Sequence, residues 1–269
     1  MAVFRRTQQV AFGLLCCLVT VPVHGQQQAQ PPSMPPSPEH PAIEPQAIAM
    51  LKATSARLAG ARSMSFTAVT TYEAPARNQQ SLYYATFSQV AMQRPNKLRV
   101  VTPGDGPASD FYYNGKSMMV YAPALNLTAV ADAPPTIEGA LKEAFVKAAV
   151  YFPFGEVLAT DPYKNMSEGL TSAFVIGQSH VVGDGIVTDM VAIKNDNVEA
   201  EIWIGVDDGL PRMIRAEYPK DPTHARYEII FTNWHINPTF KAADFTSAVA
   251  LKAPRMDFMR PDVQPVAAK

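Results

Sequence analysis

The stretch SDFYYNGKSMMVY, residues 109–121, decides the fold of this 269-residue chain. Its two halves are rich in aromatic residues, methionine and valine, which suit a pleated strand. Between them stands Asn114-Gly115, the strongest short-range signal for a two-residue hairpin turn. The sequence therefore predicts two antiparallel strands, 109–113 and 117–121, joined directly by this turn.

Segments with strand character continue on both sides of this hairpin. Short strands separated by turns every 8 to 12 residues or so are typical of an antiparallel meander. The clearest alternation lies in residues 199–206, where Ala200 and Ile202 alternate with Glu199 and Glu201. We expect strands over residues 63–73, 81–93, 97–102, 109–113, 117–121, 125–131, 172–182, 186–194, 199–206, 211–218 and 227–234.

Three segments have helical periodicity instead. Residues 45–61 and 137–150 repeat apolar residues every three or four positions, and residues 154–159 form a shorter candidate helix. A sheet of about ten or eleven strands must curl, and helices laid across its mouth enclose an apolar cavity. The predicted fold class is therefore α+β: a curled antiparallel sheet, or incomplete β-barrel, with two or three helices covering an apolar cavity.

The N-terminus has the pattern of a cleavable secretory signal. Arg5 and Arg6 precede an apolar run, residues 10–23, that is too short to cross about 30 Å of hydrocarbon. We expect cleavage near Gly25, so that residues 1–25 are the signal peptide and the rest of the chain works in the periplasm. An uncleaved membrane anchor is the alternative that the length of the run disfavours.

The sequence after the signal divides into three parts. Residues 26–42 are proline-rich, offer little to bury, and predict a disordered linker. Residues 43–250 hold the helical and strand patterns and form the predicted folded domain. Residues 251–269 remain as a C-terminal tail.

The composition of the exported part excludes several kinds of partner. Loss of residues 1–25 lowers Lys+Arg from 23 to 21 against 24 Asp+Glu, a net charge near −3 without a basic block, which argues against nucleic acid. Cys16 and Cys17 leave with the signal, so we expect no disulfide and no thiolate metal site. No later apolar stretch reaches 18 residues, so no stable membrane span is expected.

The exported part also lacks the common motifs of catalysis. It has no HExxH, GxSxG, P-loop or GxGxxG pattern, and its histidines are not spaced as metal ligands. The sequence therefore predicts no catalytic residue, no metal and no cofactor, and the protein is expected not to be an enzyme.

Methionine and aromatic residues within the strands are the candidate ligand contacts. Methionine fills irregular apolar space and suits adaptable binding surfaces, although ordinary core is the common use of such residues. Arg94 lies between two strands beside Pro95, where it can reach helix or lid backbone. The predicted ligand-binding residues are Phe66, Tyr83, Phe87, Met92, Arg94, Met118, Met119 and Phe145.

Residues 92–100 (MQRPNKLRV) and 109–123 (SDFYYNGKSMMVYAP) resemble a stretch with the pattern RPN…DGK…W.Y.P. This stretch is typical of the periplasmic lipoprotein carriers, the LolA-like superfamily. The resemblance covers residues 45–150 and extends to the order of the elements. Residues 207–212 (DDGLPR) and 231–234 (FTNW) are similar to an uncharacterised family of predicted bacterial periplasmic proteins. Two departures stand out, since Asn114 replaces the aspartate of DGK and Met119 or a neighbour replaces the tryptophan.

The resemblance implies a half-barrel with a helical lid over an apolar cavity, and a role for Arg94 in holding that lid. It predicts a periplasmic binding protein that holds a lipid, a lipoprotein acyl chain or another apolar ligand. The alternative is an envelope interaction or sensor module of the same fold, which carries no cargo and binds another envelope protein.

Overall fold

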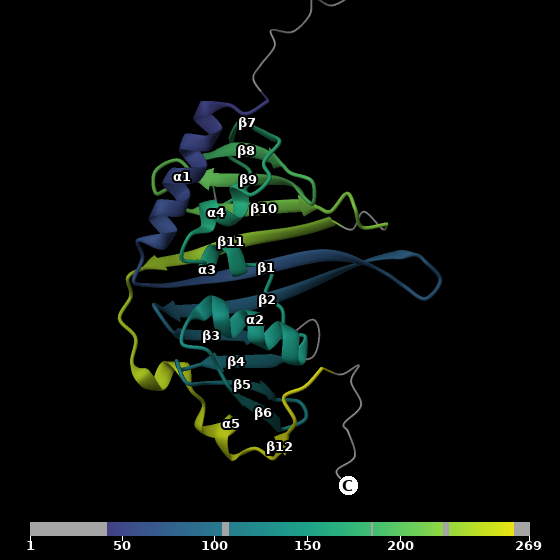
Figure 1. Ribbon diagram of the computed structural model, residues 1–269, viewed down its shortest axis with the longest axis vertical. Coiled ribbons are helices and arrows are strands. Elements are labelled where there is room, and N and C mark those ends of the chain that lie inside the picture. Colours follow the sequence, from purple (N-terminus) through teal and green to yellow (C-terminus); the bar gives the residue numbers. More distant parts are fainter. Residues whose placement is uncertain (1–41, 104–107, 184, 223–225, 261–269) are drawn as a thin grey trace, which may run out of the picture. The chain divides into compact units, whose positions relative to one another are not determined.

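The computed structural model describes residues 42–103, 108–183, 185–222 and 226–260. The predicted signal peptide, nearly all of the predicted linker and the end of the predicted tail lie outside these ranges. Within them, one sheet of twelve strands carries short helices (Figure 1). The strands are β1 (Ser63–Pro75), β2 (Ser81–Gln93), β3 (Lys97–Thr102), β4 (Ser109–Tyr113), β5 (Ser117–Ala122), β6 (Leu127–Asp132), β7 (Ser172–Ser179), β8 (Thr188–Lys194), β9 (Glu199–Gly205), β10 (Pro211–Glu217), β11 (Arg226–Ile236) and β12 (Arg255–Met256).

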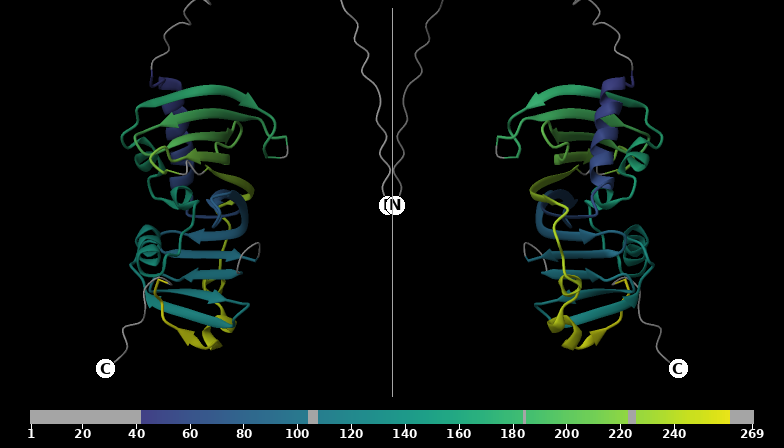
Figure 2. Two further views of the ribbon diagram at one scale, coloured as in Figure 1. Left: turned by 90° about the vertical axis from the view of Figure 1, so that its right-hand side faces the viewer. Right: turned by 90° about the vertical axis from the view of Figure 1, so that its left-hand side faces the viewer.

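The sheet consists of two meanders joined side by side. Its strand order is β12-β6-β5-β4-β3-β2-β1-β11-β10-β9-β8-β7, so β1 pairs with β2 on one side and β11 on the other. All pairings are antiparallel except that of β12 with β6. The sheet stays unclosed, with β12 and β7 at its two ends, and its strands bend in the side views (Figure 2). The predicted α+β class with an open antiparallel sheet is confirmed.

The structure has one strand more than the eleven predicted ranges, because β12 is too short to show a sequence pattern. Its two residues pair with Thr128 and Ala129 of β6 in parallel register. The backbone amide of Thr128 also donates to the carbonyl of Pro254, at 3.0 Å. Ordered elements therefore continue past residue 250.

The helices number five within the described residues, rather than two or three. They are α1 (Pro45–Ala59), α2 (Ile137–Ala148), α3 (Gly155–Leu158), α4 (Pro162–Ser167) and α5 (Ala248–Lys252), with one 3₁₀ turn, η1 (Ala242–Phe245). The two that were not predicted, α4 and α5, have only six and five residues, too few to repeat a helical period. Their first turns are capped by Asp161 and Ser247, which accept from the amides of Lys164 and Ala250.

The core lies between the sheet and these helices. Apolar residues of β1–β5 pack beneath α2 and α3, and a second cluster joins α1 to β7, β8 and β9 (Figures 1 and 2). A third, smaller cluster lies on the opposite face of β5, beneath α5, and includes Met119, Tyr121 and Ala250. We call the face of the sheet beneath α2 and α3 the helix-covered face. Both faces of the β3–β6 half are therefore occupied.

Candidate functional site

The junction between sheet and helices is built on Arg94, in the turn between β2 and β3. Its guanidinium donates to the carbonyls of Leu158 (3.1 Å) and Ala159 (2.8 Å), which end α3. It also donates to the carbonyls of Ala61 (3.2 Å) and Leu58 (3.5 Å), which end α1. One side chain therefore ties the ends of two helices to the sheet.

The two sequence motifs meet at the same junction. Asn96 of the first motif lies against Gly115 of the second, so that a Cβ built on Gly115 would lie 2.5 Å from Asn96 Nδ2. Gly115 also has φ +94°, a conformation that side chains rarely adopt. The amide of Ile137, the first residue of α2, donates to the carbonyl of Pro95 at 3.2 Å. The motifs thus position the start of α2.

Glu138 joins α2 to the end of α3. Its Oε1 accepts from the backbone amide of Thr160 at 2.6 Å. Burial opposes ionisation of this carboxyl, but its hydrogen bonds with Thr160 and the positive charge of Arg94 outweigh burial and lower its pKa. Burial in turn lowers the pKa of Arg94, an effect that Glu138 opposes. The two charges therefore support each other across the junction.

The helix-covered face changes in chemistry along β1 and β2. The residue pairs nearest the junction are apolar, and serine and threonine appear in the pairs farther along the strands. The last pair consists of two tyrosines whose stacked rings have centroids 5.5 Å apart. The paired residues, in that order, are Met64–Met92, Phe66–Val90, Ala68–Ser88, Thr70–Thr86 and Tyr72–Tyr84. The apolar part is filled, since Phe154 contacts Phe66 edge-on at 5.7 Å. In the hydroxyl-bearing part, Thr70 and Ser88 are still buried, and the face becomes open at its tyrosine end, where Tyr72 is 36% and Tyr84 41% exposed.

Three hollows surround that open part, and Tyr151 lines all of them. The β2 hollow, about 510 Å³, extends from β2 to Phe111 of β4 and Val120 of β5. The β11 hollow, about 420 Å³, lies over Thr70 and Tyr227. The α2 hollow, about 300 Å³, lies between α2 and α3. Each has the size of a small-ligand pocket, and Tyr151, 59% exposed, stands between them.

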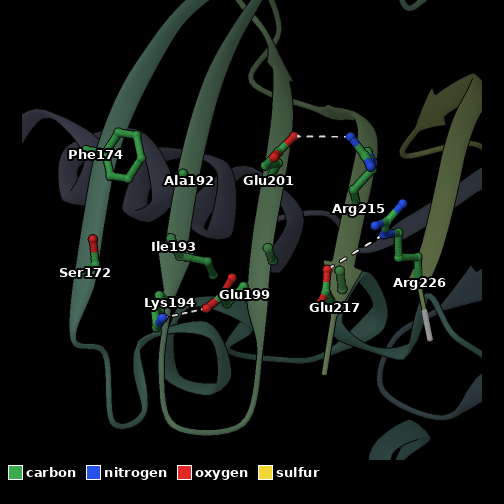
Figure 3. A pocket seen from close by; sticks show the side chains of 12 residues that line it. Ser172, Phe174, Ala192, Ile193, Lys194, Glu199, Glu201, Arg215, Glu217 and Arg226 are labelled. Atoms are coloured by element: carbon green, nitrogen blue, oxygen red, sulfur yellow. Dashed lines mark ion pairs between the residues drawn. The ribbon is translucent and has the colours of Figure 1, made fainter. Parts of the chain in front are cut away.

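Another hollow, about 320 Å³, lies on the face of β7–β10 that α1 does not cover (Figure 3). Its charges pair with one another across the strands: Lys194 with Glu199 at 2.5 Å, Glu201 with Arg215 at 3.7 Å, and Glu217 with Arg226 at 3.7 Å. Exposed ion pairs of this kind contribute little and leave no charge free for a ligand. We therefore assign the candidate site to the three hollows around Tyr151.

The structure separates the eight residues predicted to bind ligand. Phe66, Met92 and Met118 come together in the filled core beneath α2 and α3. Met119 packs on the opposite face, beneath α5, because successive strand residues point to opposite faces. Arg94 forms the junction described above.

The other three predicted residues are exposed. Tyr83 and Phe87 of β2, 65% and 38% exposed, alternate with the residues of the helix-covered face. Phe145 lines the α2 hollow and contacts the ring of Tyr151 edge-on at 6.1 Å.

Sequence reasoning missed the tyrosines around the hollows. They are Tyr72, Tyr84, Tyr151, Tyr218 and Tyr227. They come from three strands, the loop after α2 and the turn after β10, so only the tertiary fold brings them together. The one local signal is the aromatic sequence YFPF at residues 151–154, immediately after a helix.

Comparisons with known proteins address family and fold. The family described as "Predicted periplasmic protein (DUF2092)" matches residues 47–259. No curated protein matches the chain. No helix among the described residues is long and apolar enough to cross a membrane.

Three solved structures are among those similar to this chain. The lipoprotein LppX of Mycobacterium tuberculosis is 15% identical, with TM-score 0.46, over 74% of this chain and 99% of that chain. A LolA superfamily protein from Nitrosomonas europaea is 8% identical, with TM-score 0.37, over 75% and 97%. The MucA/MucB complex of Pseudomonas aeruginosa gives 14% identity and TM-score 0.42 over 76% of this chain but only 62% of that chain.

Proposed function

The chain belongs to the DUF2092 family of predicted periplasmic proteins, and we propose that it is a non-enzymatic binding protein that holds a lipid, an acyl chain or another apolar ligand. The membership confirms the similarity to a family of predicted periplasmic proteins that was found in the sequence. Export by a signal cleaved near Gly25, followed by a linker over residues 26–42 and a domain that begins at residue 43, is part of the proposal.

One observation carries it: three hollows of ligand size meet at a single exposed aromatic side chain, Tyr151. Their linings combine apolar residues with a few hydroxyl groups, which is the usual composition of a small-molecule site. Rotation of the Tyr151 ring into solvent would join the hollows into one groove over the open half of the sheet. Such a groove suits an elongated apolar chain.

The first test is direct binding. Delipidated protein is titrated with N-phenylnaphthylamine, an uncharged apolar dye, and lipids extracted from the freshly purified protein are identified by mass spectrometry. We expect saturable dye fluorescence and a co-purified lipid. No saturable binding up to about 50 µM dye, together with no lipid in the extract, would overturn the proposal.

A variant that fills the site sharpens this test. Thr86 lines both the β2 and the β11 hollow, so Thr86→Trp should abolish dye binding. Gln89 lies on the same strand but on the opposite, exposed face, so Gln89→Trp is the matched control and should bind like the native protein. Equal binding by the two variants would place the dye elsewhere.

The second candidate function, an envelope interaction module, is favoured by strand β7. It ends the sheet beyond β8, and on its outer edge residues 42–44 hydrogen-bond to the backbone of Ala173 and Val175. Phe174 and Ile176 of β7 are 43% and 45% exposed. An edge strand of this kind can accept a strand from a partner. A pull-down that returns a stoichiometric envelope protein and no lipid would favour this function.

A further inference from the structure

The β11 hollow contains a polar atom that the fold does not satisfy. The hydroxyl oxygen of Tyr227 is buried, and within the described part of the chain no group meets it with the geometry of a full hydrogen bond, although the Tyr151 hydroxyl is close enough for a weak one. Tyr151 and Tyr218 are its phenolic neighbours and line the same hollow. Because buried polar groups in native proteins are nearly always paired, an unpaired one beside a hollow indicates a partner that binds there.

The protonation of these phenols defines what that partner can be. Burial raises the pKa of Tyr227, and the nearby Tyr151 and Tyr218 raise it further. Burial also raises the pKa of Tyr218, with added effects of Tyr151 and Glu156. Both remain neutral phenols at physiological pH, so each can donate a hydrogen bond to an oxygen atom.

The charges around the hollows disfavour an anion. Carboxylates predominate in their linings, which include Glu73, Asp110, Glu138, Glu156 and Asp221. The one cation in these linings is Arg226, whose Nε lies 3.7 Å from a Glu217 carboxylate oxygen. A phosphate or free carboxylate would meet like charge here, whereas an uncharged oxygen meets none.

We propose that the β11 hollow binds the uncharged polar group of an amphipathic ligand, and that the Tyr227 hydroxyl positions this group by donating a hydrogen bond to its ester or hydroxyl oxygen. The inference rests on the proposed function and names the class of ligand. The apolar chain of the ligand then lies across Tyr151 toward the β2 hollow. Tyr227 is a specificity-determining residue, because it distinguishes ligands by their polar end.

The test compares three amphiphiles with the same dodecyl chain: dodecyl maltoside (uncharged), dodecyl phosphate (anionic) and dodecyltrimethylammonium (cationic). Each is titrated calorimetrically into the delipidated full chain below its critical micelle concentration. Native protein should bind dodecyl maltoside most tightly. Tyr227→Phe removes one oxygen, and it should weaken maltoside binding roughly fivefold while changing phosphate binding by less than twofold.

Thermal unfolding of the free proteins separates this role from a structural one. Tyr227→Phe removes an unpaired buried hydroxyl, so the melting temperature without ligand should stay the same or rise. The stabilisation by dodecyl maltoside should fall. Tyr83→Phe is the matched control, since it removes a hydroxyl from an exposed ring on the opposite face of β2. It should change neither the melting temperature of the free protein nor its stabilisation by dodecyl maltoside.

The outcomes distinguish a failure of the proposed binding function from a failure of the inference about Tyr227. If the native protein binds none of the three amphiphiles, the proposed function fails and this inference fails with it. If all three bind but Tyr227→Phe weakens none of them, or if dodecyl phosphate or dodecyltrimethylammonium binds most tightly, this inference alone is overturned and the binding function stands.

Discussion

Arg94 Nη2 donates to the carbonyl oxygen of Ala159 at 2.8 Å, which links the turn after β2 to the end of α3 across 65 residues of sequence. The same guanidinium reaches the end of α1. Carbonyls at helix ends have no partner within their helix, so the partly buried guanidinium of Arg94 is well suited to satisfy them. We therefore expect the helices to stay packed on the sheet only while this contact is intact.

The first prediction concerns that contact. Arg94→Leu should lower the free energy of unfolding by about 3 kcal/mol, because several charge-assisted hydrogen bonds are lost and the carbonyls stay buried. It should also speed amide hydrogen exchange at residues 155–160 and change the rate of dye binding. Arg62→Leu, at an exposed position nearby, is the control. If Arg94→Leu changes neither the amide hydrogen exchange at residues 155–160 nor the rate of dye binding, Arg94 does not hold the helices on the sheet.

The second prediction tests the meeting of the two motifs. Gly115→Ala should lower the free energy of unfolding by about 2–3 kcal/mol, because the methyl group meets Asn96 and φ is positive. Gly169→Ala is matched in sign of φ (+64°) but has open space around it, so it should cost only about 1 kcal/mol. Urea unfolding measures both. Equal costs would show that contact with Asn96 is unimportant.

The third prediction is a pH dependence. The pKa of Glu138 in the folded protein lies below its ordinary value of 4.5, so its ionised form adds stability above that pH, and the contribution disappears as pH falls through the folded pKa. Glu138→Gln should therefore be less stable than the native protein at pH 7, by about 1 kcal/mol or less at this partly exposed site. The difference in stability between the two proteins should disappear as the pH falls from 4.5 through the lowered pKa of Glu138.

Glu143 provides the control for that measurement. It forms an exposed pair with Lys147 on the same helix, at 2.6 Å. Glu143→Gln should cost no more than about 0.5 kcal/mol at pH 7. A Glu138→Gln gap that persists unchanged to pH 3 would contradict a role for the Glu138 charge.

The fourth prediction separates the two faces of β5. Met118→Ala should cost about 3 kcal/mol, because this side chain is fully buried beneath α2 and α3. Met119→Ala should instead loosen α5 and raise hydrogen exchange at residues 248–253, with little change in α2. Exchange measured by mass spectrometry on both variants distinguishes the faces. Similar exchange patterns for the two variants would contradict the assignment.

The strands were largely predictable, and the site was not. Alternation and the Asn114-Gly115 turn identify the β4–β5 hairpin from local sequence alone. The same alternation implies that Met118 and Met119 face opposite ways, which a list of apolar residues ignores. The tyrosine set depends on pairing between strands far apart in sequence, such as Thr70 with Ile229 and Tyr72 with Tyr227 in β1 and β11. No local pattern reports that pairing.

Photo-crosslinking tests the central claim most directly. An uncharged acyl glycerol with a diazirine in its chain is bound to delipidated protein, irradiated, and the modified peptides are sequenced by mass spectrometry. We expect crosslinks to the lining of the hollows around Tyr151, namely to Tyr84, Ala85, Thr86 and Ser88 of β2 and to residues 150–153. Crosslinks confined to the charged face of residues 192–201 and 215–217, or no specific crosslink, would contradict it.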